Sequence, residues 1–162
     1  TWRVRGRYSM KAEYVNPFYK ATYDVFELML SLHPKRSSIK AVEEMVNTKE
    51  ASVVLGVTGD LKGVIIYSFP KDMALEMVKI MSGIEMEDID GFVSSALGEV
   101  GNIISGNALT LLSENKYKCD ITPPQVLVGT YKTFSAPNEK SLLLSLNTEI
   151  GEFDISILLK EK

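Results

Sequence analysis

The segment from Ile89 to Leu112 constrains the fold most, because apolar residues recur along it at the spacing of one long helix. The stripe consists of Ile89, Phe92, Val93, Ala96, Leu97, Val100, Ile103, Ile104, Ala108, Leu111 and Leu112. Its central part nevertheless contains Gly98, Gly101 and Gly106. A glycine inside a helix costs about 0.8–1 kcal/mol relative to alanine. The segment therefore predicts a long helix whose backbone another group approaches closely.

The opposite face of the predicted helix is small and polar, and its members are Ser95, Gly98, Asn102, Ser105 and Gly106, with Glu99 at the margin. Glu99 and Asn102 are three residues apart, so their side chains lie side by side. Gly98 and Gly106 flank Asn102, whereas Gly101 borders the apolar stripe. An acid and an amide beside a bare strip of helix predict a docking surface that acts on a partner. A solvated helix face is the alternative for the pair, and close packing of helices is the alternative for the glycines.

The rest of the pattern predicts helices mainly in the first two thirds and strands at both ends. A first helix is expected from Glu13 or Pro17 to Leu32, with Asn16 as its cap and Pro17 in the first helical position. A second helix should open at Pro70 and close at Gly83. Strands are expected at 37–46, 52–58, 64–69, 117–121, 126–130, 142–146 and 153–159, with hairpin turns at 59–63 and 147–151. This order predicts an α+β fold, a mostly antiparallel β-sheet covered by long helices.

Composition excludes several classes of function. The chain has 162 residues, 45% of them hydrophobic and 24% charged, which fits a single globular domain. Its net charge is −3, and its richest basic cluster, Arg3, Arg5 and Arg7, lies in a terminal segment, so no nucleic-acid partner is expected. No apolar run reaches the roughly 18 residues that span a bilayer, and no signal peptide is visible. We therefore expect no membrane insertion and a cytoplasmic location.

The single cysteine and single histidine limit the chemistry that the chain can carry. Cys119 and His33 cannot form a zinc-type ligand set, so no metal site is expected. One cysteine also excludes an internal disulfide and fits a reducing compartment. A Cys119–His33 nucleophile pair is arithmetically possible. A loop histidine and a packed thiol are the favoured interpretations, because His33 precedes a proline at a helix exit and Cys119 falls in a strand.

The tetrad Glu-x-x-Asn occurs three times, at Glu13/Asn16, Glu44/Asn47 and Glu99/Asn102, so its spacing alone identifies no site. The first ends at the expected helix cap. The second falls in an expected strand, where residues three apart point to opposite faces. Only the third is expected in mid-helix among small residues.

In that context, residues 97–108 resemble the characteristic helix of the CheC/CheX/FliY family of bacterial chemotaxis phosphatases, whose pattern is close to Gly-Glu-x-x-Asn-x-x-x-Gly. Further segments resemble the CheX branch. They are Tyr14–Phe18, Gly56–Phe69 with Ala74 and Met81–Gly83 after it, and Asp120–Pro124. The matching segments cover nearly everything from Met10 on, in order. The resemblance implies one CheC-like domain over residues 10–162. Residues 1–9, a basic and aromatic segment before Met10, are expected to be an N-terminal extension or a remnant of cloning.

The resemblance also implies a mechanism. The substrate would be a CheY-type response regulator that carries an aspartyl phosphate and its own Mg²⁺. Asn102 would orient a water in line with phosphorus, and Glu99 would pair with the regulator's active-site lysine. Ser95, Gly98 and Gly106 would belong to the docking surface. Phosphoryl transfer needs positioning and charge stabilisation more than covalent chemistry, which suits a neutral amide.

The family relation implies further properties. CheX relatives carry one such helix and join their sheets edge to edge, so one site per chain and a homodimer are expected. Edge pairing also hides an exposed strand edge. The alternative to an enzyme is an adaptor that docks on a regulator or flagellar switch component without useful catalysis.

Overall fold

The computed structural model describes residues 2–3, 9–10, 12–42, 46–130, 132–133 and 141–161, with side chains described at 13–42, 48–130 and 141–161. Near the N-terminus, β1 (Trp2–Arg3) pairs with β2 (Ser9–Met10) across the boundary between the predicted extension and the predicted domain. Arg5 and Arg7 of the basic cluster, and Glu44 of the second tetrad, lie outside the described residues.

A seven-stranded sheet forms the scaffold of the molecule, and all of its strand pairs are antiparallel. The order is β3-β10-β11-β6-β5-β7, with β8 also paired to β5. The strands are β3 (Lys35–Val42), β5 (Ala51–Gly59), β6 (Leu61–Phe69), β7 (Cys119–Ile121), β8 (Gln125–Val128), β10 (Ser141–Thr148) and β11 (Gly151–Glu161). The short strands β4 (Val46–Asn47) and β9 (Lys132–Thr133) pair separately. The expected hairpins at 59–63 and 147–151 are confirmed.

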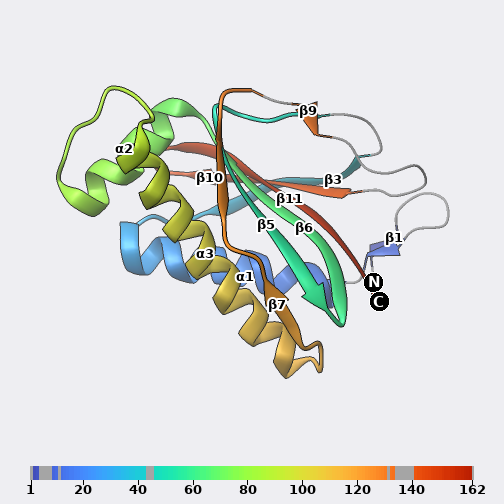
Figure 1. Cartoon of the computed structure of the whole chain (residues 1–162). Helices are drawn as coiled ribbons and strands as arrows, with labels where there is room; N and C mark the ends of the chain where they lie inside the picture. The colour runs from blue at the N-terminus through green and yellow to red at the C-terminus, as the bar shows by residue number, and fades with distance from the viewer. Residues whose placement is uncertain are drawn as a thin grey trace.

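Three helices cover one face of this sheet (Figure 1). They are α1 (Ala12–Leu30), α2 (Lys71–Ser82) and α3 (Gly91–Glu114). The predicted α+β class is confirmed. Gly83 caps α2 in the left-handed conformation with φ of 75°, as the pattern predicts. None of the helices in the described part of the chain combines the length and apolar character needed to cross a membrane.

Of the two expected starts of the first helix, the one near Glu13 agrees with the structure, and the one at Pro17 with Asn16 as its cap is wrong. Asn16 does not cap α1, and Pro17 lies inside it, because the helix already begins at Ala12. Pro17 has no N–H to donate to the carbonyl four residues earlier, so the helix lacks one hydrogen bond in its first turns. Buried Tyr14 and Val15 start the apolar face before the proline and hold these turns on the core.

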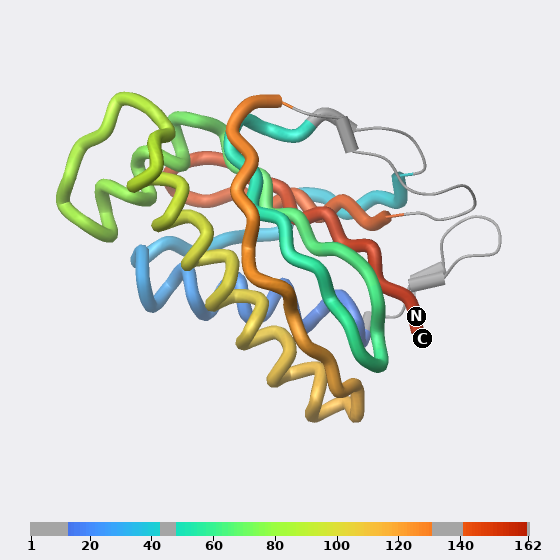
Figure 2. The backbone as a smooth tube through the Cα atoms, in the orientation of Figure 1, coloured from blue at the N-terminus to red at the C-terminus, as the bar shows by residue number. Residues whose placement is uncertain are grey.

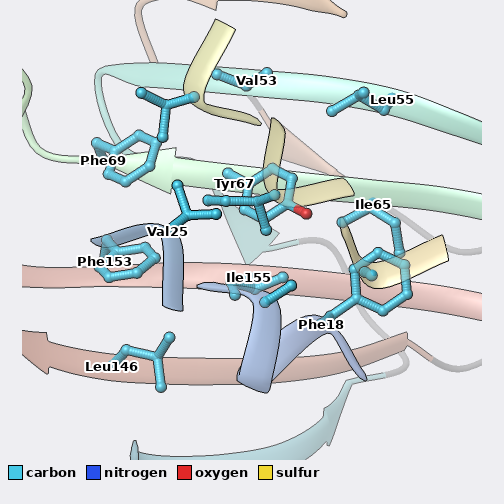
Figure 3. Packing of buried hydrophobic residues seen from close by; sticks show 14 of the residues in the cluster. Phe18, Val25, Val53, Leu55, Ile65, Tyr67, Phe69, Leu146, Phe153 and Ile155 are labelled. Carbon is cyan, nitrogen blue, oxygen red and sulfur yellow. The ribbon is translucent and has the colours of Figure 1, made fainter. Parts of the chain in front are cut away.

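Alternating strand residues build the core between the sheet and the helices (Figure 3). Val53 and Leu55 on β5, with Ile65, Tyr67 and Phe69 on β6, are buried and face the helices. The α1 ring of Phe26 stacks on Phe153 of β11 at 4.9 Å between centroids, and the ring of Phe69 stacks on Phe153 at 5.0 Å. This continuous packing makes the sheet a rigid base for α3.

Candidate functional site on helix α3

A polar cap fixes the first turn of α3, the helix that carries the predicted site. The side chain of Asp90 accepts a hydrogen bond from the backbone N–H of Val93 at 2.9 Å. The helix then runs unbroken to Glu114, and Val93, Leu97, Val100, Ile104 and Ala108 are buried along its inner side. The long helix expected from the apolar spacing is therefore confirmed.

Glu99 and Asn102 are both exposed on the outer side of this helix, adjacent in the way that their spacing predicts. Ser95 is also exposed, four residues before Glu99. An amide supplies donors and an acceptor in one group, and an adjacent carboxylate supplies a negative charge. The two together can orient a water and bind a cationic group, but they contain no nucleophile of their own.

Gly98 does not lie on the exposed face, so that expectation is wrong. Gly98 is buried. A Cβ placed there would stand 3.3 Å from Cγ2 of Val126 and 3.9 Å from Cγ of Pro124. Figure 2 shows why, since the segment that contains β7 and β8 runs along α3, next to β5. The small residue at this position is explained by packing within the chain, and Gly98 is removed from the predicted docking surface.

The segment beside Gly98 is anchored to the sheet. Thr122 receives a hydrogen bond from the backbone N–H of Gly56 on its Oγ1 at 2.8 Å, and its own N–H donates to the Gly56 carbonyl at 2.9 Å. A Cβ at Gly56 would lie 3.1 Å from Cγ2 of Thr122. These contacts hold the Pro123–Pro124 turn in place, so it forms a fixed wall along one side of α3.

Ser105 is also buried rather than on the polar face, which corrects a second expectation. Its hydroxyl lies 2.9 Å from the hydroxyl of Tyr67, a fully buried residue of β6. Burial raises the pKa of the Tyr67 hydroxyl. Nearby, a Cβ at Gly101 would lie only 2.7 Å from Cγ1 of Val53. Gly101 therefore permits the close packing of α3 on the sheet, as its position beside the apolar stripe indicates.

Gly106 differs from the other two glycines. It is half-buried and four residues after Asn102, and a Cβ there would meet nothing within 4 Å. Contacts within the described chain therefore do not explain this glycine. Its expected place on the docking surface beside Asn102 stays a prediction.

Phe92 lies outside the core, although the apolar stripe includes it. Its side chain is 45% exposed in the first turn of α3. Phe92 precedes Glu99 by seven residues, which is two helical turns, so both project from the same side of the helix. Sequence reasoning missed this residue because hydrophobicity alone assigned it to the buried stripe.

The first tetrad lies on α1, where Asn16 is exposed and Glu13 accepts a hydrogen bond from the Tyr117 hydroxyl at 2.7 Å. Asn47 of the second tetrad is in β4. The structure therefore brings Glu13 and Asn16 to a helix surface, but Glu13 is engaged by a neighbouring side chain. Among the described residues, the tetrad on α3 is the one whose two side chains are exposed beside a glycine, Gly106, that no other part of the described chain contacts.

His33 and Cys119 do not form a pair. Nδ1 of His33 lies 2.7 Å from Oε2 of Glu149, and its Nε2 lies 3.3 Å from Oε2 of Glu27. The backbone N–H of His33 also donates to Oε1 of Glu149 at 2.8 Å. Cys119, a partly buried free thiol, begins β7. Among the described residues, no group of three or more histidine, cysteine or acidic side chains is arranged to hold a metal ion.

Known proteins resemble this chain in both sequence and structure. The family model for chemotaxis phosphatase CheX matches residues 51–146. The CheY-P phosphatase CheX of Thermotoga maritima is 33% identical over 121 residues, which are 74% of this chain and 78% of that protein. Chemotaxis protein CheX from Desulfovibrio desulfuricans superposes with a TM-score of 0.81 at 28% identity, covering 93% of this chain and 99% of that chain. A chain of the CheX–CheY–BeF3–Mg²⁺ complex from Borrelia burgdorferi superposes with a TM-score of 0.74 at 27% identity, covering 93% of this chain and 100% of that chain.

Proposed function

The chain belongs to the CheX family of chemotaxis phosphatases, and from this premise we propose that it dephosphorylates a CheY-type response regulator. In the reaction, a water oxygen attacks phosphorus and the bond from phosphorus to the regulator's aspartyl oxygen breaks. The products are inorganic phosphate and the free aspartate. The relative from Thermotoga maritima is named for action on CheY-P, and the relative from Borrelia burgdorferi forms a complex with CheY.

The observation that carries this proposal is the exposed pair of Glu99 and Asn102 on a helix that packs rigidly on the sheet. Asn102 would enter the regulator's active site and orient the attacking water with its amide. A carboxylate in that position would be repelled by the phosphoryl oxygens. Glu99 would bind the regulator's lysine and fix the register of the two proteins. Positioning of this kind is the main contribution that a protein makes to phosphoryl transfer.

The docking surface would extend along α3 in both directions from Asn102. Gly106 would allow the partner's backbone to approach, Ser95 would offer a small polar contact, and Phe92 would bury its exposed ring. A standard interface covers about 800 Å² per partner, a disc of roughly 16 Å radius. Phe92 lies about 15 Å from Asn102 along the helix axis. A regulator centred on Asn102 would therefore reach Phe92.

Mg²⁺ would enter with the regulator as part of the substrate. The crystallised relative from Borrelia burgdorferi contains Mg²⁺ together with CheY and BeF3. Mg²⁺ prefers oxygen ligands in an octahedral arrangement, and α3 offers one exposed carboxylate beside the amide. Glu99 and Asn102 are thus suited to complete a regulator active site that already holds Mg²⁺.

A homodimer is the second part of the proposal. β3 is the outermost strand at one edge of the seven-stranded sheet, and most of its side chains are exposed. At the other edge, β7 and β8 lie against α3. Pairing of two copies through β3 would extend the sheet without covering Glu99 or Asn102. It would also remove an edge that could otherwise recruit other strands.

The proposal is tested by release of phosphate from the host's phosphorylated regulators, with and without this chain. Acceleration of at least one regulator's dephosphorylation, lost when Mg²⁺ is removed, is the expected result. Binding to a regulator without acceleration would favour an adaptor. Hydrolysis of a small phosphomonoester by the isolated chain without metal would contradict the proposal, because that reaction needs neither a docked regulator nor its Mg²⁺.

A further inference from the structure

The buried contact between α3 and the sheet contains one polar pair. Ser105 and Tyr67 are both fully buried, and their hydroxyl oxygens lie 2.9 Å apart. Tyr67 stands on β6 in the interior of the sheet, and Figure 3 shows its ring among the core side chains. In the described part of the chain, this is the one side-chain hydrogen bond that joins α3 to the sheet. It therefore adds a directional contact to packing that is otherwise apolar.

A second contact sets the distance between α3 and the sheet. Gly101 comes four residues before Ser105, so both face the sheet. Because a Cβ at Gly101 would lie 2.7 Å from Cγ1 of Val53 and 3.5 Å from Cδ2 of Tyr67, the helix backbone lies directly on these side chains. Gly101 thus limits how closely α3 approaches the sheet, and the Ser105 hydroxyl adds a directional contact that opposes rotation of α3 about its axis.

The rotation of α3 decides where Asn102 points. Side chains end about 5–6 Å from a helix axis, so a rotation of about 10° moves the Asn102 amide by about 1 Å. A displacement of that size can lower a rate on the order of a hundredfold. The hydrophobic effect itself is non-directional, whereas an O–H···O hydrogen bond holds its oxygens within about 2.5–3.0 Å and so opposes such a rotation.

Resting on the proposed function, we infer that Tyr67 and Ser105 are positioning residues for Asn102. Neither side chain can touch the regulator, because both are fully buried. Their hydrogen bond holds α3 in the rotation at which the exposed amide meets the phosphoryl group. Loss of this hydrogen bond should therefore slow the catalytic step, whereas the surface that binds the regulator should be unchanged.

The test uses Tyr67→Phe, Ser105→Ala and the double variant, each of which keeps the core filled or nearly so. Thr22→Val is the matched control, because the fully buried Thr22 hydroxyl on α1 bonds only to its own helix, at the Phe18 carbonyl. We measure kcat and KM for dephosphorylation of the regulator that wild type accelerates, together with the melting temperature. Each single variant should lose on the order of tenfold in kcat with KM within about twofold of wild type. The double variant should lose no more than the worse single variant, because one hydrogen bond is removed in all three.

Thr22→Val should lower the melting temperature without lowering kcat. Wild-type kcat in Tyr67→Phe and Ser105→Ala, with Asn102→Ala inactive, would overturn the inference and leave the proposed function intact. A double variant whose loss in kcat equals the product of the two single losses would also overturn the inference. If wild type accelerated no regulator, the proposed function would fail, and this inference with it.

Discussion

At the scale of single residues, the glycines of α3 serve different contacts. Gly101 faces Val53, Gly98 faces Val126, and Gly106 faces no group of the described chain. The first two permit packing within the fold, and we assign Gly106 to the partner. The same substitution should therefore have opposite effects on stability at different positions in one helix.

Gly106→Ala should raise the free energy of unfolding by about 0.5–1 kcal/mol, because alanine is the better helix former and the added Cβ meets nothing. It should also lower kcat/KM for the phosphorylated regulator on the order of tenfold, since the methyl group separates the two docked backbones. Urea unfolding and phosphate release measure the two effects. Gly101→Ala is the control and should lose stability through its clash with Val53. A Gly106→Ala variant with wild-type kcat/KM would exclude Gly106 from the docking surface.

Residue-level prediction from the sequence succeeded or failed according to whether the deciding contact was local. The adjacency of Glu99 and Asn102 follows from helical spacing alone. Gly98 and Ser105 were misplaced because their burial depends on Val126 and Tyr67, which are distant in sequence. A glycine has no side chain whose hydropathy could reveal its face, and a serine can be buried wherever a partner for its hydroxyl exists.

At the scale of elements, α3 presents an outer face with an aromatic residue at its N-terminal end and small polar residues beyond it. Phe92 is 45% exposed on that face. Exposed single hydrophobic residues are common, so exposure alone does not assign Phe92 to an interface. Its position on the same side of α3 as Glu99 supports that assignment. Aromatic residues are enriched among those that dominate binding.

Phe92→Ala should raise KM for the phosphorylated regulator on the order of tenfold, because an aromatic anchor in an interface is worth more than about 1 kcal/mol. Its kcat should stay within about twofold, since the ring is remote from the amide that acts on the water. Leu28→Ala is the matched control, because Leu28 is 86% exposed but stands on α1. Steady-state kinetics separate the two constants. Equal KM values for both variants would place Phe92 outside the interface.

A second element-level contact joins the loop after α1 to the turn between β10 and β11. Glu149 accepts hydrogen bonds from the backbone N–H and the ring of His33, and these bonds lower the pKa of its carboxyl from 4.5 to about 2. A carboxyl whose pKa is lower in the folded state stabilises the fold above its unfolded pKa. As pH falls from about 4.5 to about 2, the unfolded chain binds the proton first, and this stabilisation is lost.

The difference in unfolding free energy between wild type and Glu149→Gln should therefore shrink as the pH falls from about 4.5 to about 2. Urea unfolding at stepped pH measures this difference, and the variant controls for the titrating groups that do not contact Glu149. A difference that stays constant down to pH 2 would show that the hydrogen bonds to His33 do not contribute through the charge of Glu149.

At the scale of the whole molecule, the sheet order leaves β3 and the β7–β8 pair at opposite edges. Strand positions were predictable from alternation and turn residues, and the α+β class followed from their order along the chain. The order of strands across the sheet was not predictable in this way. β5 joins β7 and β8 more than sixty residues later, at Thr58↔Asp120 and Val53↔Val126, and no local pattern encodes such pairs. The same pairing creates the wall beside α3.

Light scattering should give a mass near twice the 18.0 kDa of the chain at micromolar concentration, because pairing of two β3 edges completes the sheet. A dilution series should convert the dimer to a monomer with no loss of kcat per chain, since each chain carries its own Glu99 and Asn102. A mass of 18.0 kDa across the micromolar range would contradict the dimer.

The most direct test of the central claim is the turnover of phosphorylated regulator by Asn102→Ala. The account predicts a loss of kcat on the order of a hundredfold, equivalent to about 2.7 kcal/mol of barrier. Binding to a regulator with a stable phosphoryl mimic should be unchanged. Asn16→Ala is the matched control, because Asn16 is an exposed asparagine with the same tetrad spacing on α1, and its activity should equal that of wild type. Asn102→Ala activity within a few-fold of wild type would contradict the account.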